Sequence, residues 1–394
     1  MVTRAMSALA KVCGDVRDGT DAEGVLGVVP KYVATPANTT EAAEVMRVAA
    51  ERGLTVVPRG AENRLDWGAP PRGCDLLVDT AGLDRVMEHA AGDLVVTVEA
   101  GVTMERLAKV LAAEGQRLAL DVPLPGSTIG GTIATGAAGP SRLLYGSVRD
   151  LLIGVTVVRA DGVIAKAGGK VVKNVAGYDL GKLYAGSYGT LGLIALATFR
   201  LHPIPAARAY VTCEVPAAEA PGRVQSVLHS LAVPSAIEVD APQGGPATVA
   251  VLLEGVPEGI EPRTTQVVRL LNADARISPQ PPDWWGAYPG GDTLVEISAR
   301  PGAFPSVQGS ARWSGTGKGY LGIPGGTPGA EVAALLDGLR RDRAVTAVVR
   351  YAPEAVRDEI DLWGPVPALA LMRRVKDQFD PEHRLSPGRF AGGI

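Results

Sequence analysis

The sequence predicts an α+β fold with more than one domain, and three observations support this prediction. The chain has 394 residues, more than a single hydrophobic core usually organises. Hydrophobic residues make up 46% and charged residues 21%, which is typical of a globular protein. Strand-like and helix-like segments alternate, and the composition changes after Pro205. We therefore expect domains at 1–205 and 206–350, followed by a C-terminal segment at 351–394.

The N-terminal half contains clear signals for individual helices and strands. Thr39 and Thr40 precede a helical pattern that ends at Gly53. An Asp-Gly pair at 161–162 predicts a hairpin turn. Residues 123–140 are rich in Gly, Thr and Ala without a period, so we expect a loop with at most a short helical piece. A second helix is expected at 103–114, and the expected strands are 54–58, 75–79, 94–101, 151–162 and 191–203.

Residues 206–350 predict a smaller α+β domain. Strand-like runs such as ATVAVLLEG (247–255) alternate with helical patterns, and Pro- and Gly-rich joints separate them. The other strand-like runs are 210–215, 235–240 and 293–298, and the expected helices are 217–231, 261–272 and 329–340. The C-terminal segment adds a helix at 367–379 and the turn-rich run DPEHRLSPGRF.

Charge, hydropathy and cysteine content exclude several classes of protein. The net charge is −3 and no basic stripe occurs, so we expect no nucleic-acid partner. No apolar run is long enough to cross a bilayer, and the first residues do not resemble a signal peptide, so we expect a cytoplasmic protein without a transmembrane segment. Three scattered cysteines cannot ligate an iron–sulfur cluster, and the four histidines show no metal-ligand spacing. We therefore expect no metal site, and an organic group as any redox cofactor.

Three glycine-rich segments are candidates for binding a ligand with their backbone. PRGAENR (58–64) follows an expected strand, and the N–H groups of such a turn can hold a phosphate. An ordinary turn explains this segment equally well, because glycine is abundant throughout the chain. PLPGSTIGGTIATGAAGPSR (123–142) combines glycines with hydroxyls and little charge, which favours binding over a flexible loop. In residues 168–194, glycines that lead into a buried strand indicate close packing against a flat or bulky group.

Together these segments resemble the FAD-binding domain of the vanillyl-alcohol-oxidase type, also called the PCMH type. Within that family they are most similar to the FAD-binding subunits of glycolate oxidases. The resemblance extends over about residues 30–203 and implies two α+β subdomains around FAD, a small α+β cap domain, and a C-terminal segment that returns to the FAD domain. The runs that carry it are TIGGTIAT (128–135), YGSVRDLLIGVTVVRADG (145–162), KVVKNVAGYDLGKLYAGSYGTLG (170–192) and DPEHRLSPGR (380–389).

The resemblance also implies which residues hold FAD. The two loops would bind the pyrophosphate, and later residues would line the ribityl and adenine parts. The implied residues are Arg59, Gly60, Ala61, Glu62, Asn63, Pro125, Ser127, Thr128, Ile129, Gly130, Gly131, Ala134, Thr135, Gly139, Tyr145, Gly146, Gly192 and Ile194. Covalent members of the family attach flavin through a histidine or cysteine, and the first loop has neither, so we expect noncovalent FAD.

The first loop departs from the usual pattern of the family at two positions. Glu62 stands where a glycine is usual, and Asn63 stands where a threonine is usual. A carboxylate within about 5 Å of a phosphate would weaken binding by ~3 kcal/mol at an effective dielectric constant of 20. This repulsion would be avoided if Glu62 pointed to water, or offset if Arg59 or Arg64 compensated its charge.

No general base can be identified from the sequence. Catalytic relatives carry an HxGDGNxH-like segment for metal and substrate in the second domain, and residues 206–394 contain none. Lys173, Tyr178 and His383 are weak catalytic candidates, and each also has an ordinary structural explanation as an exposed lysine, a packed tyrosine and a solvated turn residue.

The resemblance implies an FAD-dependent oxidoreductase acting on CH–OH groups, and three functions remain open. The first is a flavin subunit of a glycolate-type 2-hydroxyacid dehydrogenase or oxidase complex, which passes electrons to an iron–sulfur partner. Its substrate would be a small 2-hydroxy acid such as glycolate. Its partners would be a catalytic flavin subunit and an iron–sulfur subunit, through which it could sit at the inner face of the membrane. The second function is a stand-alone FAD-dependent alcohol or acid dehydrogenase, and the third is an FAD-free structural subunit of such a complex.

Overall fold

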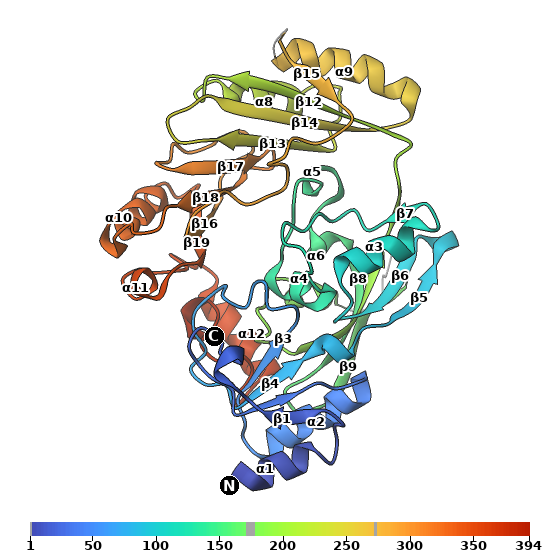
Figure 1. Cartoon of the computed structure of the whole chain (residues 1–394), viewed down its shortest axis with the longest axis vertical. Coiled ribbons are helices and arrows are strands. Elements are labelled where there is room, and N and C mark those ends of the chain that lie inside the picture. Colours follow the sequence, from blue (N-terminus) through green and yellow to red (C-terminus); the bar gives the residue numbers. More distant parts are fainter. Residues whose placement is uncertain (1, 171–177, 272–273) are drawn as a thin grey trace. The chain divides into compact units, whose positions relative to one another are not determined.

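The computed structural model describes residues 2–170, 178–271 and 274–394, which fold as two compact units (Figure 1). The first unit contains Met1–Ala137, Ser147–Pro203 and Val366–Ile394. The second unit contains Ala138–Gly146 and Ile204–Pro365. The chain passes between the units after Pro203 and after Pro365, whereas the sequence-based boundaries are at 205 and 350. The short run Ala138–Gly146 also groups with the second unit.

The first sheet of the first unit is small and mostly parallel. Its strand order is β1-β2-β4-β3, and β2–β4 and β3–β4 pair in parallel. The strands are β1 (Val16–Asp18), β2 (Tyr32–Ala34), β3 (Val56–Arg59) and β4 (Leu76–Asp79), accompanied by α1 (Val2–Leu9) and α2 (Thr39–Glu51). Helix α2 begins at Thr39, two residues before the expected start at Glu41, because the side chain of Asn38 accepts a hydrogen bond from the Glu41 N–H at 2.9 Å and caps it.

The second sheet of the first unit is antiparallel, with the strand order β5-β6-β10-β8-β9. The hairpin predicted from the Asp-Gly pair is confirmed, since β8 and β9 pair around it. The strands are β5 (Val86–Ala90), β6 (Val95–Glu99), β8 (Leu152–Val158), β9 (Ile164–Gly168) and β10 (Leu193–Arg200). A separate short pair joins β7 (Gln116–Arg117) to β11 (His202–Pro203).

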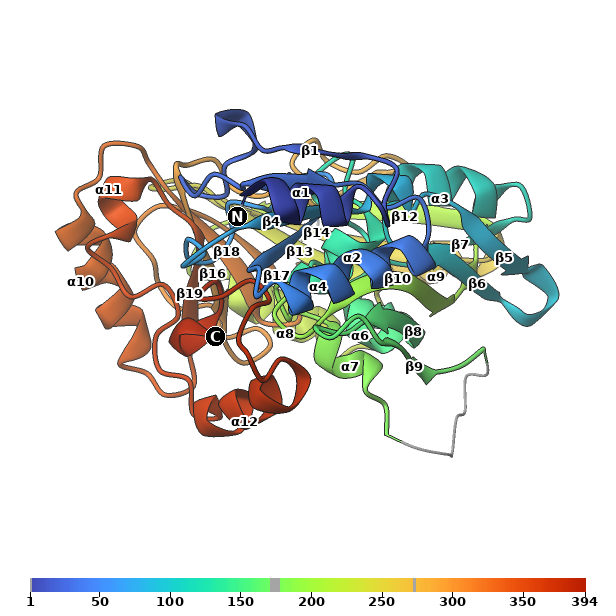
Figure 2. The ribbon, with the colours of Figure 1, turned by 90° about the horizontal axis from the view of Figure 1, so that it is seen from below.

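Helix α2 supplies much of the apolar core between the two sheets of the first unit. One buried cluster joins its Ala42 and Met46 to Val78 of the first sheet and Ala195 of the second. Figure 2 shows α2 beside α1, which packs against it. The remaining helices of this unit are α3 (Met104–Ala112), α4 (Ile129–Thr135), α6 (Val148–Leu151), α7 (Gly181–Tyr184) and α12 (Leu369–Phe379).

The second unit contains an antiparallel sheet with the order β15-β12-β14-β13-β17-β18-β16-β19. Alternation along its strands gives the sheet one apolar face, which includes Val249 and Val251 and packs against helices such as α9. The opposite face is rich in charged residues. The strands are β12 (Ala207–Val215), β13 (Ala236–Ala241), β14 (Ala247–Gly255), β15 (Arg276–Ser278), β16 (Thr293–Ser298), β17 (Ser310–Ser314), β18 (Lys318–Ile323) and β19 (Thr346–Tyr351). The helices are α5 (Arg142–Tyr145), α8 (Ala220–Leu228), α9 (Pro257–Leu271), α10 (Gly329–Arg340) and α11 (Glu354–Arg357).

Candidate cofactor-binding site

A pocket in the first unit brings together the two glycine-rich loops selected from the sequence. Its walls come from the end of β3 and the loop after it, from α4 and its N-cap, from Tyr188 and Gly189 before β10, and from Arg389 near the C-terminus. Its volume is about 80 Å³, far below the roughly 300–1,000 Å³ of pockets that enclose a whole small-molecule ligand. This space therefore suits a phosphate-sized group rather than an entire dinucleotide. The predicted FAD residues that line it are Gly60, Ala61, Glu62, Asn63, Thr128, Gly131, Ala134 and Thr135.

Glycine is required where the two loops approach each other. A Cβ atom at Gly60 would lie 2.3 Å from the hydroxyl of Thr128, and a Cβ at Gly130 would lie 2.9 Å from the Cβ of Ala100. The Thr128 hydroxyl also caps α4, since it accepts a hydrogen bond from the Gly131 N–H at 3.2 Å. Gly131 itself has a single close neighbour in the described chain, the Thr128 hydroxyl at 3.1 Å from its Cβ position. Its Cα therefore leaves room on the pocket side.

Glu62 is compensated by an arginine, as one of the sequence-based alternatives required. Its carboxylate forms an ion pair with Arg59 at 2.6 Å, and its side chain is 52% exposed. The buried Arg59 guanidinium also binds Asp79 at 2.6 Å, so the ion pair with Glu62 extends a fixed network. The φ angle of Glu62 is +65°, a left-handed conformation in which glycine is preferred. This conformation explains why glycine is usual at this position.

Asn63 and Arg64 join the first glycine-rich loop to the second by hydrogen bonds. The Asn63 amide donates to the Pro125 carbonyl at 2.9 Å and to the Ser127 hydroxyl at 3.0 Å. Arg64 donates to the same Ser127 hydroxyl at 3.0 Å. Ser127 in turn donates to the Leu124 carbonyl at 2.6 Å. The structure thus gives Ser127 and Asn63 a positioning role in joining the two loops.

Two buried arginines carry hydrogen-bond donors that have no partner in the described chain. These donors are Nε and Nη2 of Arg64 and Nη1 of Arg389, and the two side chains are 6% and 3% exposed. Burial lowers the pKa of Arg389 to about 10. Buried unpaired donors are unfavourable, so guanidinium groups at a pocket wall indicate a site for an anion. The unpaired donors of Arg64 and Arg389 fit the phosphate of a dinucleotide.

Arg389 is also a link between distant parts of the chain. Its Nη2 donates to the carbonyls of Leu65 at 2.8 Å and Trp67 at 2.7 Å, and it thereby holds the C-terminal segment against the first loop. Sequence reasoning considered Arg64 only as a possible partner of Glu62, and it missed Arg389. The available signals were an arginine directly after the first loop and the terminal arginine of the DPEHRLSPGR run.

The remaining predicted FAD residues lie outside the lining of this pocket. Gly192 directly precedes β10 and Ile194 is buried within it, while Ile129 is buried in α4. Gly139, Tyr145 and Gly146 belong to the second unit. There the Tyr145 hydroxyl donates to the Glu254 carboxylate at 3.0 Å.

None of the three weak catalytic candidates is among the residues that line the pocket. Lys173 lies outside the described residues. Tyr178 is 90% exposed, so the packed position expected for it is wrong. His383 is about half exposed, and its Nε2 lies 2.9 Å from the carboxylate of Asp377.

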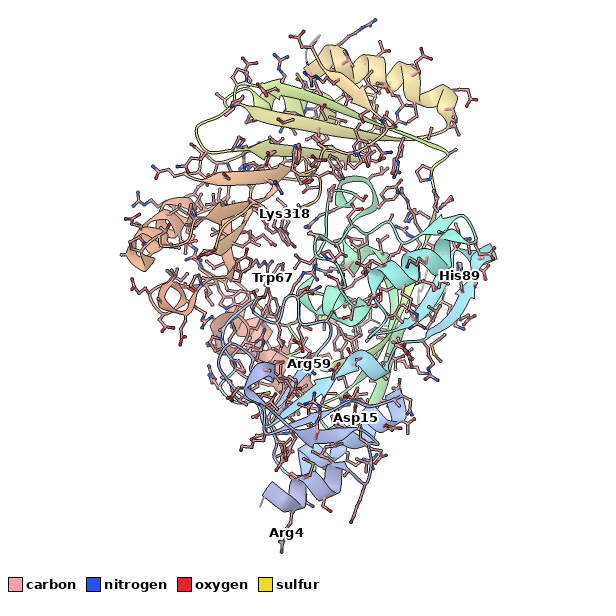
Figure 3. The ribbon with its side chains drawn as sticks, viewed as in Figure 1. Arg4, Asp15, Arg59, Trp67, His89 and Lys318 are labelled. Carbon is pink, nitrogen blue, oxygen red and sulfur yellow. The ribbon has the colours of Figure 1, made fainter. Side chains whose placement is uncertain are left out.

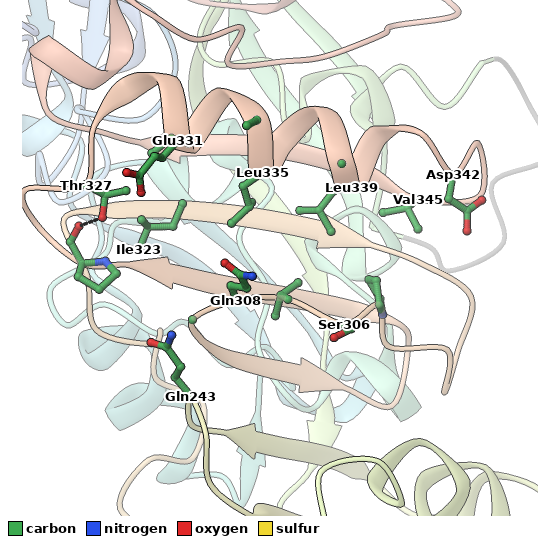
Figure 4. Close-up of a pocket in the computed structure, with 17 residues that line it drawn as sticks. Gln243, Ser306, Gln308, Ile323, Thr327, Glu331, Leu335, Leu339, Asp342 and Val345 are labelled. Carbon is green, nitrogen blue, oxygen red and sulfur yellow. Dashed lines mark hydrogen bonds between the residues drawn. The ribbon is translucent and has the colours of Figure 1, made fainter.

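A larger pocket, of about 700 Å³, lies in the second unit between α10 and the segment 305–309 (Figure 4). Leu335 and Leu339 form part of its apolar wall, and the charged residues that line it are Glu331 and Asp342. Because both charges are negative, this pocket does not fit a phosphate or a carboxylate.

Two searches of the described residues bear on the metal and membrane predictions. Among residues 2–170, 178–271 and 274–394, no group of three or more His, Cys, Asp or Glu side chains is arranged to hold a metal ion. In the same ranges, no helix has the length and hydropathy needed to span a membrane.

Comparison with known proteins assigns the pocket-forming region to a domain type. Residues 30–168 match the model of a family described as an FAD binding domain. Glycolate oxidase subunit GlcD of Bacillus subtilis is 35% identical over 178 residues, which are 45% of this chain and 38% of that protein. The mitochondrial D-2-hydroxyglutarate dehydrogenase of Bos taurus is 34% identical over 176 residues, 44% of this chain and 32% of that protein. The matched stretch thus spans less than two fifths of the length of these relatives.

Solved structures share the fold over nearly the whole chain. A p-cresol methylhydroxylase with bound substrate has a TM-score of 0.78 at 15% identity and covers 98% of this chain and 96% of its own. An alkyldihydroxyacetonephosphate synthase has a TM-score of 0.71 at 15% identity, with 98% and 86% covered. These findings confirm the predicted PCMH-type fold, and the match of residues 30–168 to an FAD binding domain supports FAD as the expected cofactor.

Proposed function

We propose that this chain binds one FAD noncovalently and acts in the oxidation of a small 2-hydroxy acid such as glycolate. The observation that carries the proposal is the pocket of the first unit, whose two buried guanidinium groups have unpaired donors beside glycine-rich loops. The match of residues 30–168 to an FAD binding domain supports the identity of the cofactor. The names of the glycolate oxidase and D-2-hydroxyglutarate dehydrogenase relatives support the substrate class.

The pocket residues would hold the cofactor through both side-chain and backbone contacts. Arg64 and Arg389 would pair with a phosphate of FAD, and the backbone at Gly131 would approach it closely. Neither cysteine nor histidine lines the pocket within the described chain, which supports noncovalent attachment. Bound flavin would supply the capacity to accept a hydride from the α-carbon of the acid.

The finer proposal concerns the route of the electrons. The three cysteines are scattered and buried, so an iron–sulfur cluster that received electrons would be held by another protein. A relative that is itself described as a glycolate oxidase subunit supports a role within a complex. We propose a relay from flavin to an iron–sulfur partner.

The visible absorbance spectrum of the purified full chain, recorded after adding FAD and desalting, tests cofactor binding. We expect a retained flavin band that acid precipitation releases into solution. Gly131→Glu fills the open side of the pocket with a carboxylate and should abolish the band. Gly222→Glu is the matched control, because Gly222 is an exposed glycine in α8 with no atom within 4 Å of its Cβ position.

The results separate the three functions that the sequence left open. A wild-type chain that folds but does not bind FAD would contradict the proposal and favour a structural subunit. Retained FAD with rapid glycolate-dependent reduction of an artificial acceptor by the isolated chain would favour a stand-alone dehydrogenase. Retained FAD with turnover only after a partner is added would support the relay.

A further inference from the structure

The apolar face of the sheet in the second unit is covered partly by helices and partly by a loop. Helices α8 and α9 pack against β14, and α10 packs against β19. Between these helices lies the segment 299–309, which joins β16 to β17. Phe304 of this segment stacks on Trp313 of β17, with the ring centroids 5.2 Å apart and an angle of 16° between the rings. A loop thus covers the middle of this face, where a helix would fill more space.

The strand register places Trp313 on the apolar face. Trp313 lies opposite Val239 of β13 and Gly319 of β18. A Cβ atom at Gly319 would lie 2.2 Å from the Trp313 ring, so glycine leaves room for the indole. Lys318, the preceding residue of β18, is labelled in Figure 3 and lies on the opposite, charged face. The space beside Phe304 therefore belongs to the apolar side of the sheet.

Two adjoining cavities lie beside the segment 299–309. The larger one is the pocket of about 700 Å³ in Figure 4, into which Leu335 and Leu339 point from α10. The smaller one has a volume of about 420 Å³. The cavities share Pro305, Asp342 and Val345 as lining residues, so they have a common wall. Both volumes fall within the roughly 300–1,000 Å³ that is typical of sites for small molecules.

The smaller cavity carries two opposite charges that do not pair with each other. Its charged lining residues are Arg300 and Asp342. Within the described residues, the guanidinium of Arg300 has neither an ion-pair partner nor a hydrogen-bond acceptor. The Asp342 carboxylate accepts one hydrogen bond through Oδ1, from the Ala344 N–H at 2.8 Å. Arg341 and Arg343 flank Asp342 in the sequence but line neither cavity.

A cation and an anion held apart beside an apolar wall match a ligand with three corresponding groups. An ammonium group at Asp342, on the common wall, can direct an apolar chain into the larger cavity against Leu335 and Leu339. A carboxylate of the same ligand can then pair with Arg300 in the smaller cavity. We propose that the two cavities bind an α-amino acid with a large apolar side chain. All of these residues belong to the second unit, so the site is independent of the cofactor pocket.

Isothermal titration of the full chain with L-phenylalanine and two analogues tests this site. The analogue 2-phenylethylamine lacks the carboxylate, and 3-phenylpropionate lacks the ammonium group. We expect phenylalanine to bind at least about tenfold more tightly than either analogue, because each analogue loses one charge-assisted contact. Arg300→Met should weaken phenylalanine about tenfold and leave 2-phenylethylamine unchanged. Asp342→Asn should weaken phenylalanine about tenfold and leave 3-phenylpropionate unchanged.

The matched controls are Arg343→Met and Asp337→Asn, which change exposed residues that line neither cavity and should leave the phenylalanine affinity within about twofold of the wild type. Arg300→Lys keeps the charge and should restore binding to within about threefold. The asparagine oxygen at 342 can still accept from the Ala344 N–H, so this variant should fold.

Three outcomes would overturn the inference. The first is a folded wild-type chain that does not bind phenylalanine. The second is binding of 2-phenylethylamine as tightly as phenylalanine, which would indicate a site for cations alone that uses Glu331 and Asp342. The third is a phenylalanine affinity that is the same in the wild type, Arg300→Met and Asp342→Asn.

Discussion

Lys376 binds the C-terminal segment to the core of the first unit, and we predict how much its replacement lowers the free energy of unfolding. Its ammonium is 1% exposed and donates to the carbonyls of Thr190 at 2.8 Å and Leu385 at 2.9 Å. It also pairs with Asp380, which is fully buried, at 2.6 Å. These bonds join α12 to the turn before β10 and to the run that leads to Arg389. Lys376→Met therefore removes three hydrogen bonds and leaves the Asp380 charge without its cation.

The size of this loss of unfolding free energy follows from the burial of the Lys376–Asp380 ion pair. Breaking a buried ion pair from one side typically costs 3–5 kcal/mol, and within the described part of the chain the carboxylate of Asp380 keeps only the Leu385 N–H as a partner, at 2.7 Å. With a urea slope of roughly 3 kcal/mol per molar, this predicts that the unfolding midpoint of the first unit falls by more than about 1 M. Because Asp380 Oδ1 already lacks a partner in the described chain, the double variant Lys376→Met with Asp380→Leu should recover most of the loss.

Urea unfolding combined with hydrogen exchange of peptides that cover 380–390 measures both effects. The exchange reports the segment directly, since the N–H groups of Leu385 and Ser386 are bonded in the folded state. The reasoning is refuted if Lys376→Met moves the midpoint by less than about 0.3 M, or if the double variant is the less stable of the two. Arg374→Met, on the same helix and exposed, is the matched control.

Three further predictions concern the first loop and its surroundings. Glu62→Gly should raise stability by at most about 1 kcal/mol, because it relieves a left-handed residue but loses a half-exposed ion pair, and FAD should bind as tightly or more tightly. Glu62→Ala is the control that keeps the backbone cost, and a weaker FAD affinity in Glu62→Gly would contradict the argument. Asn63→Ala should weaken FAD binding by up to roughly thirtyfold in a fluorescence titration, since two inter-loop hydrogen bonds of about 1 kcal/mol each are lost; unchanged affinity would show that the loops hold their positions without them. Hydrogen bonding to Arg17 lowers the pKa of Glu23 to about 2, so Glu23 stabilises the fold above its ordinary pKa near 4.5, and this contribution is lost as the pH falls toward 2. The difference in thermal midpoint between wild type and Glu23→Gln should therefore shrink on acidification from about pH 7 to about pH 3, and a constant difference would exclude this linkage.

Local patterns in the sequence predicted many of the helices and strands. The apolar period of residues 329–340 predicted α10 with the observed bounds, and the Asp-Gly pair predicted the β8–β9 hairpin. The strands β17 and β18 were missed because β17 has only five residues and β18 is interrupted by Gly319 and Gly322, so their burial depends on neighbours that pair only in the folded sheet. Tertiary context decided these elements.

The candidate site was predictable only where it is local in sequence. The glycines of both loops could be selected because a close backbone approach requires them, and eight of the predicted residues line one pocket. Arg389 could not be joined to Arg64, because no local pattern relates residues 325 positions apart. The grouping of Gly139 and Tyr145 with the second unit likewise depends on long-range contacts.

The bond from Arg389 to Leu65 also sets the order in which the site can be built during synthesis. The whole run Ile204–Pro365 of the second unit is translated between the two glycine-rich loops and Arg389. A nascent chain that has emerged only as far as the second unit holds both loops but lacks one wall of the pocket. We therefore expect cofactor capture to be a late step, with flavin retained by finished molecules and not by chains that stop before Arg389.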